Sequence, residues 1–200
     1  MKDLVIYIHG KGGSAGESRH YESLFPDSEV IGLDYRSSTP WEAGPEIRSQ
    51  VERLRSSDSN MTLIANSIGA FFSMHAGIGR MIRKAYFISP IVDMEQLIRN
   101  MMTWAGVSEQ DLAEKGVIAT SFGEPLSWDY LCFVRDHPVC WQVPTQILYG
   151  SRDNLTSDET IRAFAEAHGA GLTVMEDGEH WFHTEEQMRF LDTWILRENR

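Results

Sequence analysis

Short apolar segments alternate with segments of helical periodicity along most of this chain. Each apolar segment is rich in Val, Ile, Leu and aromatic side chains on successive positions, which is typical of a strand buried on both faces. The predicted strands are residues 3–9, 29–35, 61–66, 84–89, 145–150 and 171–176. The predicted helices between and after them are residues 43–55, 67–77, 157–169 and 184–198. Strands that alternate with helices form parallel units with right-handed crossovers, so the pattern predicts a three-layer α/β fold.

One long interval interrupts the alternation. About fifty residues separate Asp93 from Pro144, which is too many for a bare connection. The elements expected within it are helices over 94–106 and 108–116, a hairpin in 117–130 around Gly123-Glu124, and a helix over 128–138 that Pro138 ends. We therefore interpret residues 1–200 as a single domain. Residues 94–138 are an insertion within it, which we expect to cap one end of the sheet.

Charge and composition exclude several classes of partner. The 200-residue chain has a net charge of −11, so its field would repel a nucleic-acid backbone. No apolar run reaches the roughly 20 residues that a transmembrane helix needs, and the N-terminal LVIYI is too short for a signal peptide. We therefore expect a cytoplasmic protein without a membrane partner. Cys132 and Cys140 are then expected to be reduced, with a disulfide between them as the alternative.

A single serine stands where a predicted strand meets a predicted helix. In ANSIG (65–69), Ser67 has the small residues Ala65 and Gly69 two positions away on either side. A tight strand-to-helix turn needs small residues there, and it projects its central side chain from the carboxyl edge of the sheet. The pattern predicts a nucleophilic Ser67, with the N–H of Ile68 as one oxyanion donor. Two points stand against this: Ser67 could merely cap the helix, and Ala65 departs from the usual G-x-S-x-G motif.

Three further segments follow predicted strands and carry the other groups that acyl transfer needs. The glycine-rich IHGKGGS (8–14) offers the N–H of Lys11 or Gly12 to the same oxyanion. Asp153 lies in LYGSRDNLT after the fifth strand, and His180 lies in EDGEHWFHT after the sixth. Taken singly, each has a plainer explanation as a flexible loop, a turn residue or a surface histidine.

The order along the chain links these residues. Ser67, Asp153 and His180 follow one another as nucleophile, acid and base, each at the carboxyl end of a predicted parallel strand. Such ends meet at one edge of the sheet, so we predict a catalytic triad. His183 is the rival base. It takes second place because it precedes Thr184 and two glutamates, where helix capping explains it.

In this order, HGKGG, ANSIG, GSRD and GEHW resemble the α/β-hydrolase superfamily, in particular small bacterial serine hydrolases that lack the first two strands of the larger fold. The resemblance covers essentially the whole chain. It implies a six-stranded, mostly parallel sheet of order 2-1-3-4-5-6 with helices on both faces. It also implies that the insertion after the fourth strand serves as a cap. It does not fix the substrate, because one fold hosts many functions.

The expected activity is hydrolysis of small carboxylic esters through a Ser-His-Asp triad and an acyl-enzyme. An acyl thioesterase, and a ligand-binding or signalling protein with slow or no turnover, are the alternatives. Candidates for substrate contacts are Met101, Met102 and Trp104 for an acyl chain, and Arg36 and Lys11 for an anionic group. Core packing and solvation explain these residues at least as well. We expect no metal or other cofactor. The expected partner is a small-molecule ester or thioester, and the oligomeric state stays open.

Overall fold

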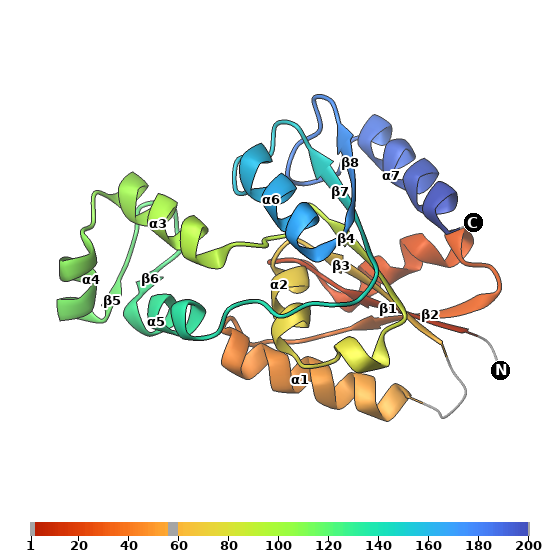
Figure 1. Ribbon diagram of the computed structural model, residues 1–200, viewed down its shortest axis with the longest axis horizontal. Coiled ribbons are helices and arrows are strands. Elements are labelled where there is room, and N and C mark those ends of the chain that lie inside the picture. The colour runs from red at the N-terminus through yellow and green to blue at the C-terminus, as the bar shows by residue number, and fades with distance from the viewer. Residues whose placement is uncertain (1–2, 56–59, 200) are drawn as a thin grey trace. The chain divides into compact units, whose positions relative to one another are not determined.

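The computed structural model describes residues 3–55 and 60–199, and the described residues form one six-stranded sheet (Figure 1). Its strands are β1 (Asp3–Ile8), β2 (Ser28–Leu33), β3 (Met61–Asn66), β4 (Lys84–Ile88), β7 (Thr145–Gly150) and β8 (Gly171–Met175). Their order is β2-β1-β3-β4-β7-β8, and neighbouring strands are parallel. The predicted α/β fold and the predicted strand order, with β7 and β8 as the fifth and sixth strands, are confirmed.

Helices cover both faces of this sheet. The 3-10 helix η1 (Ala15–Leu24) and α7 (Glu185–Glu198) lie on one face, and α1 (Pro40–Leu54), α2 (Ile68–His75) and α6 (Asp158–His168) lie on the other (Figure 1). The chain moves from β1 to β2 in the opposite direction to its later steps, so a right-handed crossover places η1 on the face opposite α1 and α2. Strand β1 is accordingly buried at five successive residues.

Two helices differ from the sequence prediction. Helix α1 starts at Pro40 rather than at residue 43, because proline is well suited to the first position of a helix. The helix η1 was not predicted at all. Its buried residues, Ser18, Tyr21 and Leu24, recur every three positions, which is the period of a 3-10 helix rather than an α-helix. A search for a period of 3.6 therefore passes over it.

The chain divides into two compact units, residues 1–92 with 140–200, and Asp93–Val139. The second unit contains α3 (Met94–Ala105), α4 (Glu109–Lys115), β5 (Val117–Ile118), β6 (Leu126–Ser127) and α5 (Trp128–Asp136). Strands β5 and β6 form the antiparallel pair expected around Gly123, and α5 ends before Pro138. The interpretation of residues 94–138 as a cap stays a prediction.

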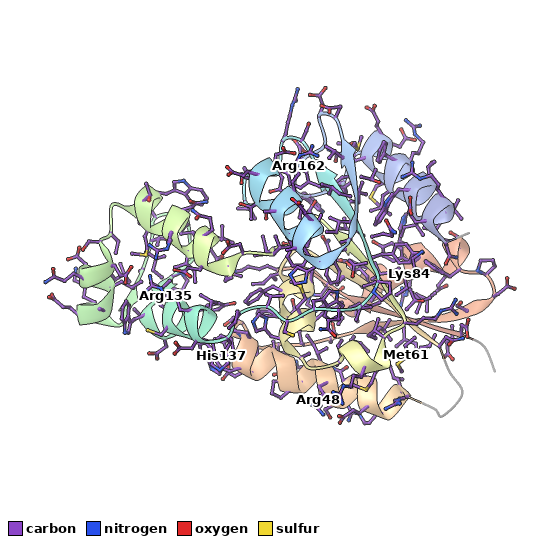
Figure 2. All side chains as sticks on the ribbon, in the orientation of Figure 1. Arg48, Met61, Lys84, Arg135, His137 and Arg162 are labelled. Carbon is purple, nitrogen blue, oxygen red and sulfur yellow. The ribbon has the colours of Figure 1, made fainter. Side chains whose placement is uncertain are left out.

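Within the second unit, Arg135 joins three helices (Figure 2). From α5, its Nη1 and Nη2 atoms donate to the two carboxylate oxygens of Glu109 on α4, each at 2.8 Å. Its Nε donates to Glu95 Oε1 on α3 at 3.0 Å. These hydrogen bonds lower the pKa of Glu95 and of Glu109 below the ordinary value. A bidentate arginine therefore fixes the arrangement of these helices within this unit.

The described residues also show the state of the thiols and two structural absences. Cys132 and Cys140 both carry free thiols, so the alternative of a disulfide between them does not hold. No described helix combines the length and apolar character needed to cross a bilayer. Within residues 3–55 and 60–199, no group of three or more His, Cys, Asp or Glu side chains is arranged to hold a metal ion.

Candidate active site

Ser67 occupies the turn between β3 and α2 in a strained backbone conformation. Its φ and ψ are 52° and −122°, a region that non-glycine residues rarely adopt. The Ser67 N–H donates to the carbonyl of Ile88 at 3.0 Å, and the Ile91 N–H donates to the carbonyl of Ser67 at 3.2 Å. In the described part of the chain, the Ser67 side chain makes no capping bond to α2. The helix-cap explanation therefore does not account for this serine.

The small residues on either side let strand and helix pass closely. A Cβ atom added at Gly69 would lie 2.4 Å from the carbonyl oxygen of His9 and 2.8 Å from that of Ile8. Position 69 therefore accepts only glycine without a backbone shift. Ala65 is fully buried and pairs in register with Ile8 of β1 and Phe87 of β4. Its methyl group is accommodated there, so the departure from a glycine at this position does not prevent the turn.

Replacing Gly69 by alanine is expected to destabilise the fold by about 2–4 kcal/mol, because the added methyl group meets backbone rather than a movable side chain. Chemical denaturation measures this loss. Gly16→Ala is the matched control, since a Cβ atom at Gly16 would come no closer than 3.5 Å, to Ser14 Oγ. An unfolding midpoint for Gly69→Ala equal to that of Gly16→Ala would contradict the tight-turn interpretation.

Asp153 lies just beyond β7 with its side chain fully buried. Its backbone N–H donates to the carbonyl of Gly150 at 2.9 Å. Its Oδ1 atom accepts hydrogen bonds from the backbone N–H groups of Leu155 at 2.8 Å and Thr156 at 3.1 Å. These bonds stabilise the carboxylate and hold its orientation. The other oxygen, Oδ2, is thereby directed to a separate partner.

His180 lies in the loop between β8 and α7, and two glycines hold this loop against the Asp153 loop. A Cβ atom at Gly150 would lie 2.4 Å from the carbonyl oxygen of Gly178, so the two backbones are nearly in contact. The Arg152 N–H donates to that same carbonyl at 2.8 Å. The positions of Asp153 and His180 are therefore fixed relative to each other by main-chain contacts.

The structure brings Ser67, His180 and Asp153 into one hydrogen-bonded series. The distance from Ser67 Oγ to His180 Nε2 is 2.8 Å, and that from His180 Nδ1 to Asp153 Oδ2 is 2.7 Å. An ionised carboxylate can only accept, so the proton of a neutral His180 resides on Nδ1. Nε2 is then left as an acceptor for the Ser67 hydroxyl. This arrangement allows a base to remove the serine proton, with an acid orienting the base.

All three side chains emerge at the carboxyl edge of the sheet. They follow β3, β7 and β8, which run parallel. Met61 and Lys84 begin β3 and β4 and lie together at the opposite, amino-terminal edge (Figure 2). The carboxyl edge of an open parallel sheet is where ligands commonly bind, so the location agrees with a reactive centre.

The rival base, His183, does not join this series. Its ring is exposed and stacks on Trp181 with centroids 4.3 Å apart. Its Nδ1 atom lies 2.8 Å from the Trp181 carbonyl oxygen, and its backbone N–H donates to Gln187 Oε1 at 3.1 Å. Gln187 belongs to the capping box that starts α7 at Thr184. The helix-start interpretation of His183 is therefore the one that its contacts support.

The loop after β1 passes beside Ser67. A Cβ atom at Gly10 would lie 3.1 Å from Ser67 Cβ. Lys11 and Gly12 follow at an exposed turn, in which Gly12 has a φ of 73° and the Gly13 N–H donates to the carbonyl of Gly10 at 3.2 Å. Ile68 begins α2 directly after the serine. The N–H groups of Lys11, Gly12 and Ile68 stay candidates for an oxyanion site, close to the serine along the chain or in space.

The predicted substrate contacts are not brought to the serine by any described contact. Arg36 is exposed, and its backbone N–H donates to Glu46 Oε2 at 3.0 Å. Met101, Met102 and Trp104 belong to α3 in the second unit, where Met102 is buried and Trp104 stacks edge-on against Phe122. Their part in substrate binding stays a prediction.

Two residues of the site's surroundings were not singled out in the sequence. Ser89, after β4, is fully buried with a φ of 42°, and its N–H donates to the Leu148 carbonyl at 2.8 Å. His9 is buried and stacks on Tyr35 with centroids 4.4 Å apart. The proline after Ser89 and the glycine after His9 are the available signals, since both mark an unusual backbone.

Comparison with solved structures shows that this fold is shared with known proteins. Est1E from Butyrivibrio proteoclasticus superimposes with a TM-score of 0.80 at 17% identity, covering 99% of this chain and 87% of that one. Mouse alpha/beta hydrolase domain-containing protein 10 superimposes with a TM-score of 0.70 at 16% identity, covering 98% of this chain and 89% of that one. A monoacylglycerol lipase from Paleococcus ferrophilus gives 0.64 at 18% identity, with 97% and 94% coverage. No family model matches the chain, and no curated protein matches it in sequence.

Proposed function

Because this chain adopts the α/β-hydrolase fold, we propose that it is a serine hydrolase that cleaves small carboxylic esters. The observation that carries the proposal is the series Ser67 Oγ, His180 Nε2, His180 Nδ1, Asp153 Oδ2, with distances of 2.8 Å and 2.7 Å at its two hydrogen bonds. The strained conformation of Ser67 supports it, because such strain clusters at functional positions. Among proteins of this fold, the neighbour named a monoacylglycerol lipase supports ester chemistry at the level of class.

In the proposed mechanism, His180 takes the proton of Ser67 as the serine oxygen attacks the ester carbonyl. Asp153 keeps the ring in the required tautomer and stabilises its positive charge. The C–O bond to the alcohol then breaks, and His180 gives its proton to the leaving alkoxide. A water molecule attacks the acyl-enzyme with His180 again as base, which releases the acid and restores Ser67.

The negative oxygen that forms during each attack needs hydrogen-bond donors. The proposed donors are the N–H of Ile68 at the start of α2 and the N–H of Lys11 or Gly12 in the loop beside Ser67. Removal of a single side-chain donor from such a site costs an enzyme roughly 3–4 kcal/mol of transition-state stabilisation. They act mainly on kcat, because the charge that they stabilise is absent from the bound ester.

A panel of p-nitrophenyl esters of increasing acyl length, measured beside the matching acyl-CoA thioesters, tests the substrate class. The proposal expects faster turnover of the esters, with one preferred chain length. Faster turnover of the thioesters would indicate an acyl thioesterase with the same triad. A fluorophosphonate probe, which reacts with activated serines, provides the companion measurement. Absence of both labelling and turnover would overturn the enzyme assignment in favour of a binding protein.

A further inference from the structure

Tyr7 of β1 and Glu17 of η1 form a hydrogen bond between their side chains. The Tyr7 side chain is buried in the core on the η1 and α7 face. The hydroxyl donates to Glu17 Oε2 at 2.5 Å. Burial raises the pKa of Tyr7 well above its ordinary value, so the hydroxyl keeps its proton for Glu17. One buried hydroxyl thus joins two different segments of the chain.

Through Glu17, this hydrogen bond reaches the loop that carries the proposed oxyanion donors. Glu17 Oε1 accepts the backbone N–H of Ser14 at 3.2 Å. A Cβ atom at Gly13 would lie 2.6 Å from the same Oε1 atom, so the carboxylate packs directly against the backbone of the loop. The path of residues 10–14 therefore depends on where Glu17 is held, and Tyr7 is the group that holds its second oxygen.

The same loop passes beside the turn that carries the nucleophile. Asn66 is the last residue of β3 and directly precedes Ser67. The Ser67 backbone is strained at φ 52°, and such a conformation persists only when its surroundings hold it. The close passage of Gly10 is part of those surroundings, since a Cβ atom added there would lie 3.1 Å from Ser67 Cβ.

We propose that Tyr7 is a positioning residue that, through Glu17, holds the oxyanion loop, residues 10–14, in place beside Ser67. The inference rests on the proposed function and deepens it. An oxyanion hole works only when its donors lie about 2.7–3.1 Å from the place where the charge develops. The two donor segments follow different strands, so the distance between them depends on how the loop is held. The hydrogen bonds from the Ser14 N–H and from the Tyr7 hydroxyl to the two oxygens of Glu17 help to hold it.

Tyr7→Phe removes only the hydroxyl, and Tyr86→Phe is the matched control. Tyr86 is fully buried in the same core cluster, but its hydroxyl lies 3.4 Å from Asn199 Oδ1, at the end of α7. For Tyr7→Phe we expect kcat to fall about tenfold, the loss that one buried hydrogen bond can cause, with KM changed less than about twofold. Tyr86→Phe should keep the wild-type kcat, whatever it does to the unfolding midpoint.

A double-mutant cycle with Glu17→Gln tests whether the effect passes through Glu17. If both residues act through one hydrogen bond, the double variant should lose no more kcat than the worse single variant. The proposal would be overturned if the kcat losses of the two single variants multiplied in the double variant. It would also be overturned if Tyr7→Phe kept the wild-type kcat, or if kcat fell equally in Tyr86→Phe. Ser67→Ala, assayed in parallel, separates this from failure of the proposed function. If Ser67→Ala hydrolyses the ester as the wild type does, the site assignment itself is wrong.

Discussion

Replacing Ser67 by alanine is expected to lower kcat/KM for ester hydrolysis by about 10⁴-fold or more. The change removes the only atom that can form the acyl-enzyme in the proposed mechanism, and the remaining donors can assist direct attack by water only weakly. The fold should persist, because the Ser67 hydroxyl bonds to His180 and makes no capping bond to α2 within the described residues. Fluorophosphonate labelling should disappear together with turnover.

Ser73→Ala is the matched control for this experiment. Ser73 lies in α2, the helix that follows Ser67, and is fully buried. Among the described contacts, its hydroxyl donates only to the backbone carbonyl of Gly69, at 2.6 Å. We expect this variant to be labelled and to hydrolyse esters as the wild type does. Retention of more than about a tenth of wild-type kcat/KM in Ser67→Ala, a loss below ~1.4 kcal/mol, would show that Ser67 is not the nucleophile.

His180→Ala is expected to reduce kcat/KM by about 10³-fold or more and to abolish fluorophosphonate labelling. The Ser67 hydroxyl would lose its proton acceptor, and Asp153 cannot replace it, because Asp153 reaches the serine only through the His180 ring. The buried carboxylate would also lose one of its partners, so some loss of stability accompanies the loss of activity. Steady-state kinetics, measured well below the unfolding temperatures of the wild type and of His180→Ala, separates the loss of catalysis from the loss of stability.

His183→Ala is the matched control for His180→Ala. It removes a nearby imidazole that does not act as the base in the proposed mechanism. The His183 ring is exposed and contacts Trp181, so labelling should persist and kcat/KM should stay within about threefold of the wild type. Any effect should appear in the unfolding midpoint, since His183 stands beside the capping box of α7. Loss of labelling in His183→Ala alone would reverse the assignment of the two histidines.

The local features of the fold could be read directly from residue patterns. Runs of successive apolar residues marked the strands because a parallel sheet covered on both faces buries every residue, as β1 illustrates. Ser157 and Ser108 have the residue type that favours a helix N-cap, and the side chain of each accepts the backbone N–H three residues on. The helix η1 was not predicted, because its buried residues repeat every three positions rather than with the α-helical period.

The candidate site was only partly readable in this way. The chain order of Ser67, Asp153 and His180, each after a strand, is a property of the sequence, and parallel pairing places such positions at one edge. The sequence favours His180 over His183 only because His183 precedes Thr184 and two glutamates at a helix start. The structure separates the two by their contacts, since His180 bonds Ser67 and Asp153 whereas His183 lies against Trp181. Tyr7 carried no motif, because it is a core tyrosine of a strand. Glu17 belongs to the capping box that Ser14 starts, but the helix η1 that follows was not predicted.

By itself, the sequence determined the six strands of the sheet, their alternation with helices, and the set of residues able to act as nucleophile, acid and base, because these depend on near neighbours along the chain. Only the tertiary structure decided which of them meet. Ser67 and His180 are 113 residues apart and His180 and Asp153 are 27 apart, yet each pair is within hydrogen-bond distance. Those distances depend on close backbone passages, Gly69 against His9 and Gly150 against Gly178, which arise only when the strands assemble side by side.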